Sequence, residues 1–219
     1  MQTPRAFVLG GALLLAAAAP ARAQTSPWQD MWFWGAQGGV NLFKTATSTA
    51  TETAFTVGGH WLITGKRSGL YLSYDQVLYD NALGRVNDVT SGTGTRDVQF
   101  DNVRLIHADL LAIPIDGNLQ LMLGAGVTIH QISDPVVQGT FATPGDQSFS
   151  QSVAEDAAIR AFWNLLAGFQ LQFGGRFALF GHYQFMPSAS GFLVTSEQHT
   201  LAGGLRIALS GRVEDITKQ

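Results

Sequence analysis

The stretch Phe177–Phe185, FALFGHYQF, alternates two kinds of side chain. One register is apolar and aromatic, and the other ends in His182 and Gln184. Strict alternation is the period of a β-strand, whose successive side chains point to opposite faces. In a soluble β-sandwich the apolar face packs into a core. In a membrane barrel the apolar face contacts lipid and the polar face fills the interior, so the rest of the sequence must decide between the two.

The N-terminal segment has the layout of a secretory signal peptide. Arg5 precedes an apolar run over residues 6–19, and the small-residue triplet Ala-Arg-Ala follows shortly after. The run is too short to serve as a stable membrane anchor. We expect a cleaved signal peptide over residues 1–23 and a mature chain that begins at Gln24.

The composition favours a membrane barrel over a soluble domain. Charged residues make up 13% of the chain, against a usual share of about 25%. There are 25 glycines and no cysteine. Removing residues 1–23 lowers the basic count from 13 to 11 against 16 acidic residues, a net charge of −5. Such a charge argues against nucleic acid as a partner. No mature segment has a long enough apolar run for a transmembrane helix.

Eight segments with this alternation predict eight strands. Each has roughly 9 to 14 residues, enough to cross a bilayer when tilted. The predicted strands are Trp32–Phe43, Ala54–Thr64, Gly69–Tyr79, Asn102–Ile113, Leu119–Ile132, Ile159–Gln172, Phe177–Phe185 and His199–Leu209.

The connections alternate between short and long. The short ones are rich in turn-forming residues and are Gly65–Gly69, Pro114–Asn118 and Phe173–Arg176. The long polar ones are Lys44–Thr53, Asp80–Asp101, Ser133–Ala158 and Met186–Gln198. Outer-membrane barrels have this asymmetry, with short periplasmic turns and long external loops. We therefore predict an all-β fold over residues 24–209, a single eight-stranded antiparallel up-and-down transmembrane β-barrel, followed by a polar tail at 210–219.

The inward register of these strands is too polar for a dry sandwich core. We expect its side chains to form a polar network that fills the barrel, because buried polar groups must satisfy one another. The expected partner of Arg206 is Asp75 or Asp109. The predicted network comprises His60, Asp75, His107, Asp109, His130, Gln170, His182, Gln184 and Arg206.

Aromatic residues gather near the ends of the predicted strands. Trp and Tyr favour the membrane–water interface, so the set is interpreted as aromatic girdles around the barrel. Trp28 belongs to this set. The lipid-interface aromatics are predicted to be Trp32, Trp34, Trp61, Trp163, Phe173, Phe177 and Phe185.

Three stretches of the sequence resemble a known class. They are WFWGAQGGVNLF (residues 32–43), the hairpin over 110–129, and FALFGHYQF with HTLAGGLRIAL (177–209). Over residues 28–209 the chain resembles the small bacterial outer-membrane barrels of the OmpA-like and Opa-like class. The resemblance implies residence in the outer membrane among its lipids and lipopolysaccharide, after insertion by the barrel-assembly machinery. Such chains usually end on an aromatic residue, whereas here a polar tail follows Leu209. The recognition signal is then internal, or the tail is a periplasmic extension.

Neither a metal site nor any other cofactor is expected. Four histidines, at 60, 107, 130 and 182, point inward from four different strands. Their predicted depths differ, and zinc needs its ligands to converge about 2 Å from one point.

The sequence does not predict an enzyme. Some eight-stranded outer-membrane barrels are lipid A deacylases with a His-x-Ser motif. Here His182 is followed by Tyr183 and Gln184, and an amide cannot act as the nucleophile.

Four interpretations remain open at this stage. The favoured one is a structural and interaction scaffold that displays four external loops, with a surface ligand contacted through loops 80–101 and 133–158. A narrow pore for ions or small solutes is the first alternative, helped by interior glycines. A lipid A-modifying enzyme and a soluble periplasmic barrel with an apolar ligand are the others. The glycines in question are Gly58, Gly124, Gly126, Gly168 and Gly204.

Overall fold

The computed structural model describes residues 30–48, 50–173, 176–188 and 191–209. The predicted signal peptide with its cleavage site, Trp28 and the tail 210–219 lie outside these residues.

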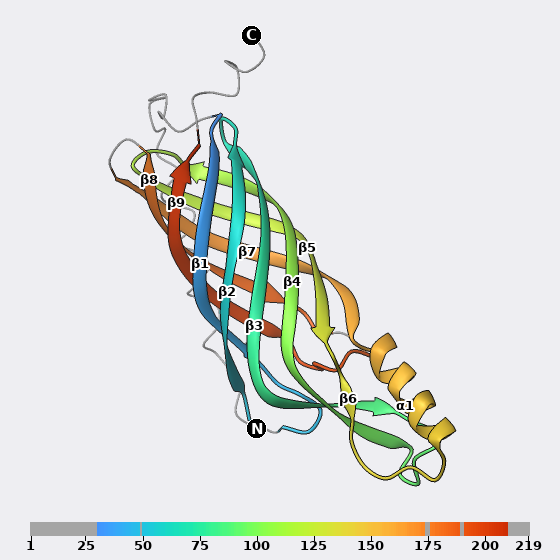
Figure 1. Ribbon diagram of the computed structural model, residues 1–219. Coiled ribbons are helices and arrows are strands. Elements are labelled where there is room, and N and C mark those ends of the chain that lie inside the picture. Colours follow the sequence, from blue (N-terminus) through green and yellow to red (C-terminus); the bar gives the residue numbers. More distant parts are fainter. Residues whose placement is uncertain (1–29, 49, 174–175, 189–190, 210–219) are drawn as a thin grey trace, which may run out of the picture.

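Within the described residues, eight antiparallel strands form a closed barrel (Figure 1). Strand β1 pairs with β2 along one edge and with β9 along the other, so the first and last strands close the sheet. The predicted eight-stranded antiparallel up-and-down barrel is confirmed. Its strands are β1 (Trp32–Phe43), β2 (Glu52–Thr64), β3 (Ser68–Asn87), β4 (Thr95–Ile115), β5 (Leu119–Ser133), β7 (Ile159–Phe173), β8 (Phe177–Met186) and β9 (Gln198–Ala208).

The two faces of the barrel wall have opposite exposure. Large apolar side chains project from the outer face, and Phe55 and Leu110 are 70% and 73% exposed. The alternate positions are buried inside, where the wall of an eight-stranded barrel leaves room for side chains only. An apolar exterior around a polar interior is the arrangement that lipid requires. Among the residues described, no helix is long and apolar enough to cross a membrane.

The connections fall into two sets at the two ends of the barrel. The turns after β2, β4 and β7 are short, and we call their side the turn end. The remaining connections gather at the loop end, where Figure 1 also shows the helix.

The prediction that residues 80–101 form a loop was wrong. Pairing of β2 with β3 stops at Leu78, but β3 continues to Asn87 and pairs with β4 beyond the barrel wall. An irregularity between Leu78 and Ala82, with Asn81 at φ 52°, shifts the phase of the alternation. Only residues 88–94 connect the two strands.

The connection 133–158 is also more ordered than predicted. It contains the short strand β6 (Val136–Val137), which pairs with β4, and helix α1 (Pro144–Asp156). Thr143 caps the helix: its hydroxyl accepts from the Asp146 amide at 3.2 Å. Together with the hairpin extension at residues 82–100, β6 and α1 form a unit that we call the platform (Figure 1).

Candidate functional site

Arg206 lies inside the barrel near the turn end and is 1% exposed. Its Nε donates to Nε2 of His60 at 2.7 Å, and its Nη1 donates to Oε1 of Gln170 at 2.6 Å. Its guanidinium carbon lies 3.9 Å from the ring centroid of Phe180. These three contacts replace water around a buried cation.

The strand register explains the contact between Arg206 and His60. Gly35 on β1 pairs with His60 on one side and with Arg206 on the other. A Cβ at position 35 would lie 2.5 Å from the His60 ring. The glycine therefore leaves the space through which the two side chains meet across β1.

The prediction that Arg206 pairs with Asp75 or Asp109 was wrong. Strand β9 pairs with β1 and β8. The partners of Arg206 therefore lie two strands away on either side, on β2 and β7. Asp75 and Asp109 stand on β3 and β4, the far side of the barrel, where they face Gly58 and Gly126.

Asp75 belongs to a second group of polar side chains. One of its carboxylate oxygens accepts from Gln37, and the other lies 3.5 Å from Nε2 of His107. Nδ1 of His107 lies 2.7 Å from the Thr128 hydroxyl and 2.9 Å from Nε2 of Gln184. This group connects β1, β3, β4, β5 and β8 across the interior.

The remaining interior groups stand apart from both clusters. Nε2 of His130 lies 3.1 Å from the sulfur of Met186. Both carboxylate oxygens of Asp109 and Nδ1 of His182 are buried without a hydrogen-bond partner in the part of the chain that is described.

All nine residues predicted for the interior are at most 6% exposed. They form separate groups rather than one network. The prediction did not include four polar residues that complete the group around Asp75 and His107, although their inward register would have placed them in the interior. They are Gln37, Tyr71, Thr128 and Asn164. Across the described ranges, no group of three or more His, Asp or Glu side chains could hold a metal ion.

Apolar layers close the interior at both ends. At the turn end the layer is built around Phe33 and Leu62, both 0% exposed. At the loop end, residues 192–194 of the β8–β9 connection enter the barrel mouth. The Phe192 ring lies 5.2 Å from that of Phe162, and Leu193 packs against Gly84 of the platform. The polar groups therefore lie between two apolar layers.

The predicted lipid-interface aromatics lie on the outer face, at two levels. Trp34 pairs with Trp61 across β1 and β2, and Trp163 lies 5.9 Å from Phe185 between ring centroids. Near the turn end lie Trp32, Trp34, Trp61, Phe173 and Phe177, and toward the loop end lie Trp163 and the half-buried Phe185.

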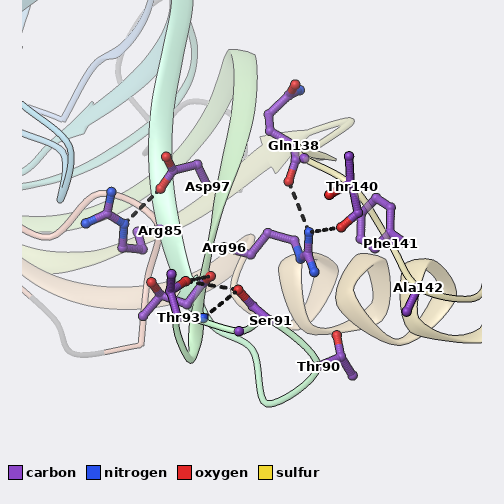
Figure 2. A pocket seen from close by; sticks show the side chains of 13 residues that line it. Arg85, Thr90, Ser91, Thr93, Arg96, Asp97, Gln138, Thr140, Phe141 and Ala142 are labelled. Carbon is purple, nitrogen blue, oxygen red and sulfur yellow. Dashed lines mark hydrogen bonds and ion pairs between the residues drawn. The ribbon is translucent and has the colours of Figure 1, made fainter.

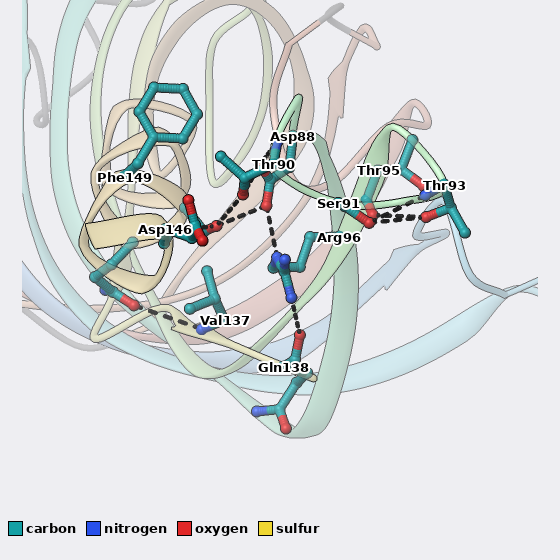
Figure 3. Close-up of polar contacts among 12 residues, drawn as sticks. Asp88, Thr90, Ser91, Thr93, Thr95, Arg96, Val137, Gln138, Asp146 and Phe149 are labelled. Carbon is teal, nitrogen blue, oxygen red and sulfur yellow. Dashed lines mark hydrogen bonds and ion pairs between the residues drawn. The ribbon is translucent and has the colours of Figure 1, made fainter. Parts of the chain in front are cut away.

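A buried carboxylate ties the platform together (Figure 3). Asp88 is 0% exposed and accepts from Nε of Arg96, from the Ser150 hydroxyl of α1 at 2.6 Å, and from the amide and hydroxyl of Thr90. Burial alone raises the pKa of Asp88, but the hydrogen bonds from Ser150, Arg96 and Thr90 outweigh it and hold the pKa well below its usual range.

Arg96 extends this tie to the segment that precedes α1. Its Nη1 donates to the carbonyl oxygens of Gln138 and Thr140 at 3.4 and 3.2 Å, and its guanidinium lies 4.1 Å from the Phe141 ring centroid. The hairpin tip, the segment 138–142 and the helix are thus held by one buried ion pair.

A groove of about 880 Å³ lies between the hairpin tip and the segment 138–142 (Figure 2). It joins the two connections, 80–101 and 133–158, for which the sequence predicts a surface ligand. Beside it, Nε of Arg85 donates to Oδ1 of Asp97 at 2.8 Å. Most of its lining residues are polar, namely Arg85, Thr90, Ser91, Thr93, Thr95, Arg96, Asp97, Gln138 and Thr140. The other lining residues are Gly92, Gly139, Phe141 and Ala142.

No protein-family model matches the chain, and the curated proteins contain no significant match. Among solved structures, the chain is similar to the Neisserial surface protein A, with a TM-score of 0.55 and 11% identity over 80% of this chain and 96% of that one. At this identity the likeness shows the fold alone.

Two other solved structures match less closely. They are the outer membrane protein OprG from Pseudomonas aeruginosa (TM-score 0.43, 11% identity, 82% of this chain and 94% of that one) and the attachment invasion locus protein Ail of Yersinia pestis (TM-score 0.41, 12% identity, 81% and 99%).

Proposed function

We propose that this chain, which has the fold of the small eight-stranded outer-membrane barrels, lies in a bacterial outer membrane and acts as a scaffold. Its barrel holds the platform at the cell surface and performs no turnover. Outer-membrane lipids and lipopolysaccharide surround the wall, and the barrel-assembly machinery inserts it. The observation that carries the proposal is the closure of the interior by apolar layers at both ends, which leaves the ordered platform as the surface available to a partner.

The surroundings of the interior glycines favour the scaffold over the pore. A Cβ at Gly58 would collide with the carboxylate of Asp75, and one at Gly126 with that of Asp109. Side chains from the neighbouring strands therefore occupy the spaces that these glycines leave, and no channel follows from them.

The orientation of the β8 side chains favours the scaffold over a lipid A-modifying enzyme. His182 and Gln184 point into the barrel and are 6% and 2% exposed. Only Tyr183 between them faces outward, where an acyl chain would lie.

Single-channel recording tests whether the interior is closed. We expect the mature chain, refolded and incorporated into a planar bilayer, to produce no current steps, with a heat-dependent gel shift as the folding control. A variant with Phe192, Leu193 and Val194 replaced by serine opens only the loop-end layer. It should also stay silent, because Phe33 and Leu62 still close the turn end. Discrete current steps from the wild-type protein would favour the pore over the closed scaffold.

Cysteine labelling tests which end faces the outside. The sequence contains no cysteine, so a single introduced thiol is unambiguous. Val89 at the platform tip is 86% exposed, and Arg67 in the β2–β3 turn is also exposed. A membrane-impermeant maleimide should label Val89→Cys on intact cells and Arg67→Cys only after permeabilisation. The reverse pattern would refute display of the platform.

A further inference from the structure

We propose that the groove between the hairpin tip (residues 88–95) and the segment 138–142 binds an uncharged or weakly charged saccharide. The proposal rests on the scaffold function, since it requires the platform to face the outside of the cell. It adds the chemical class of the ligand and the residues that contact it.

The walls of the groove are fixed before any ligand arrives. Asp88 joins the hairpin tip to α1 through Ser150. Arg96 pairs with Asp88 (Figure 3) and donates to the carbonyls of residues 138 and 140 (Figure 2). Binding to a preorganised surface avoids the entropic cost of ordering loops. The groove volume of about 880 Å³ also lies in the range of small-molecule sites, about 300–1,000 Å³.

The lining offers unused hydrogen-bonding groups on both walls (Figure 2). Thr95 on one wall and Thr140 on the other have hydroxyl groups for which the described residues supply no partner. The same holds for the two terminal nitrogens of Arg85, whose Nε alone is taken up by Asp97. Hydroxyls donate and accept, a guanidinium donates, and a carboxylate accepts. A ligand rich in hydroxyl groups matches this mixture.

Phe141 adds an apolar surface to the polar lining. Its ring is held in place by Arg96, 4.1 Å from the ring centroid. Because Arg96 lies over this ring and the ring packs against the buried cluster, Phe141 offers a ligand its apolar edge. An apolar edge beside polar groups suits the C–H groups and hydroxyls of a pyranose.

The charges of the groove argue against other ligand classes. Arg96 is paired with Asp88 and Arg85 with Asp97, so no excess positive charge is left to attract a polyanion. Among the described residues, Asp97 is the only acidic one in the lining, whereas Ca²⁺ takes 6–8 oxygen ligands. The polar lining also disfavours an apolar ligand.

The saccharide has two possible sources. One is the uncharged hexose region of the lipopolysaccharide of the same membrane, and the other is a neutral glycan presented from outside the cell. Both present the same chemistry to the groove, so the experiment must separate them.

The test measures binding to the full mature protein in detergent micelles, by saturation-transfer NMR and calorimetry. The probes are the uncharged hexose oligosaccharide of the lipopolysaccharide outer core, which we call the core oligosaccharide, and chitotriose, maltotriose and a sulfated disaccharide. Binding of the core oligosaccharide assigns the membrane source, and binding of only another neutral sugar assigns an external one. No binding by a heat-modifiable sample, or binding of the sulfated probe alone, overturns the proposal.

Two matched substitutions locate the site. Asp97→Asn removes the acceptor charge at the groove, and we expect it to weaken binding about tenfold or more. Asp80→Asn makes the same chemical change on the hairpin outside the groove, where Asp80 contacts Asn81 at 2.9 Å, and should leave binding unchanged. Equal affinity of the two variants overturns the site. Because micelle binding does not depend on orientation or conductance, this failure is distinct from failure of the scaffold proposal.

Discussion

Arg206 and His60 meet across a strand that contributes no side chain between them: Nε of Arg206 donates to Nε2 of His60 over Gly35, at 2.7 Å. Within the described part of the chain, this cation lies in the interior without a carboxylate partner. The contact depends on the glycine as much as on the two residues that touch.

Replacing Gly35 should therefore destabilise the barrel. A Cβ there lies 2.5 Å from the His60 ring and 2.7 Å from the Leu205 carbonyl oxygen, so Gly35→Ala should lower the free energy of unfolding by about 1–3 kcal/mol. Urea unfolding in micelles measures the change. Gly38→Ala on the same strand is the control, because the nearest atom to its Cβ is 3.7 Å away. Equal effects of the two substitutions would contradict the packing argument.

The contact of Arg206 with Gln170 should appear as a coupling energy. In a double-mutant cycle of Arg206→Met and Gln170→Leu, we expect about 1.5–3 kcal/mol of coupling in the free energy of unfolding, the range for a hydrogen bond to a charged group. Gln184→Leu replaces Gln170→Leu in the control cycle, since Gln184 contacts His107 instead. A coupling near zero in the first cycle would mean that the 2.6 Å contact is not made.

Acid should release the platform only at low pH. The folded pKa of Asp88 is depressed, so its stabilising contribution is complete above the unfolded value of about 3.9 and is lost progressively as pH falls from there through the lower folded pKa. The anisotropy of a dye on Val89→Cys should stay constant from pH 7 to about 5 and decrease below about pH 4. With Asp88→Asn added, it should be low at every pH. A decrease in anisotropy already near pH 6 would mean that a group other than Asp88 holds the platform together.

A charged residue on the outer face of the barrel should destabilise the protein in a bilayer, because that face contacts lipid. Leu110 is 73% exposed and pairs with Ala125 near the middle of β5. In a bilayer, Leu110→Arg should cost about 2–4 kcal/mol of folding free energy, as arginine does at the midplane. Val89→Arg, at the platform tip, should be neutral. A soluble protein would tolerate both substitutions, so equal unfolding free energies in vesicles would argue against a membrane barrel.

The alternation of side chains predicted the barrel because one repeating pattern governs every strand. The starts of β1, β5, β7 and β8 coincide with the predicted ones. The pattern failed at Asn81, where a positive φ shifts the phase and the continuing strand reads as a polar loop. The helix was missed because it buries only Ser150 and Ala154 and so has no apolar stripe. The sequence TPGD at 143–146, a cap followed by Pro and an acidic residue, could have revealed it.

The partners of the interior residues were harder to predict than their orientation. Parity along a strand states which side chains face inward, and all nine are buried. Which of them meet depends on the register between strands that are not adjacent in sequence. Gly35 is the example: its role is visible only once β1 is placed between β2 and β9.

Residues 192–194 lie in the connection between β8 and β9, and they pack into the barrel mouth and against Gly84 of the platform. Val194 also bridges to Thr45, just beyond the end of β1. The outer surface therefore reaches its final shape only after the two ends of the sheet have found each other, which is the contact of longest sequence separation and the slowest kind to form. A molecule that recognises the surface formed by residues 192–194 against the platform thereby distinguishes a fully assembled copy from one whose assembly has stalled.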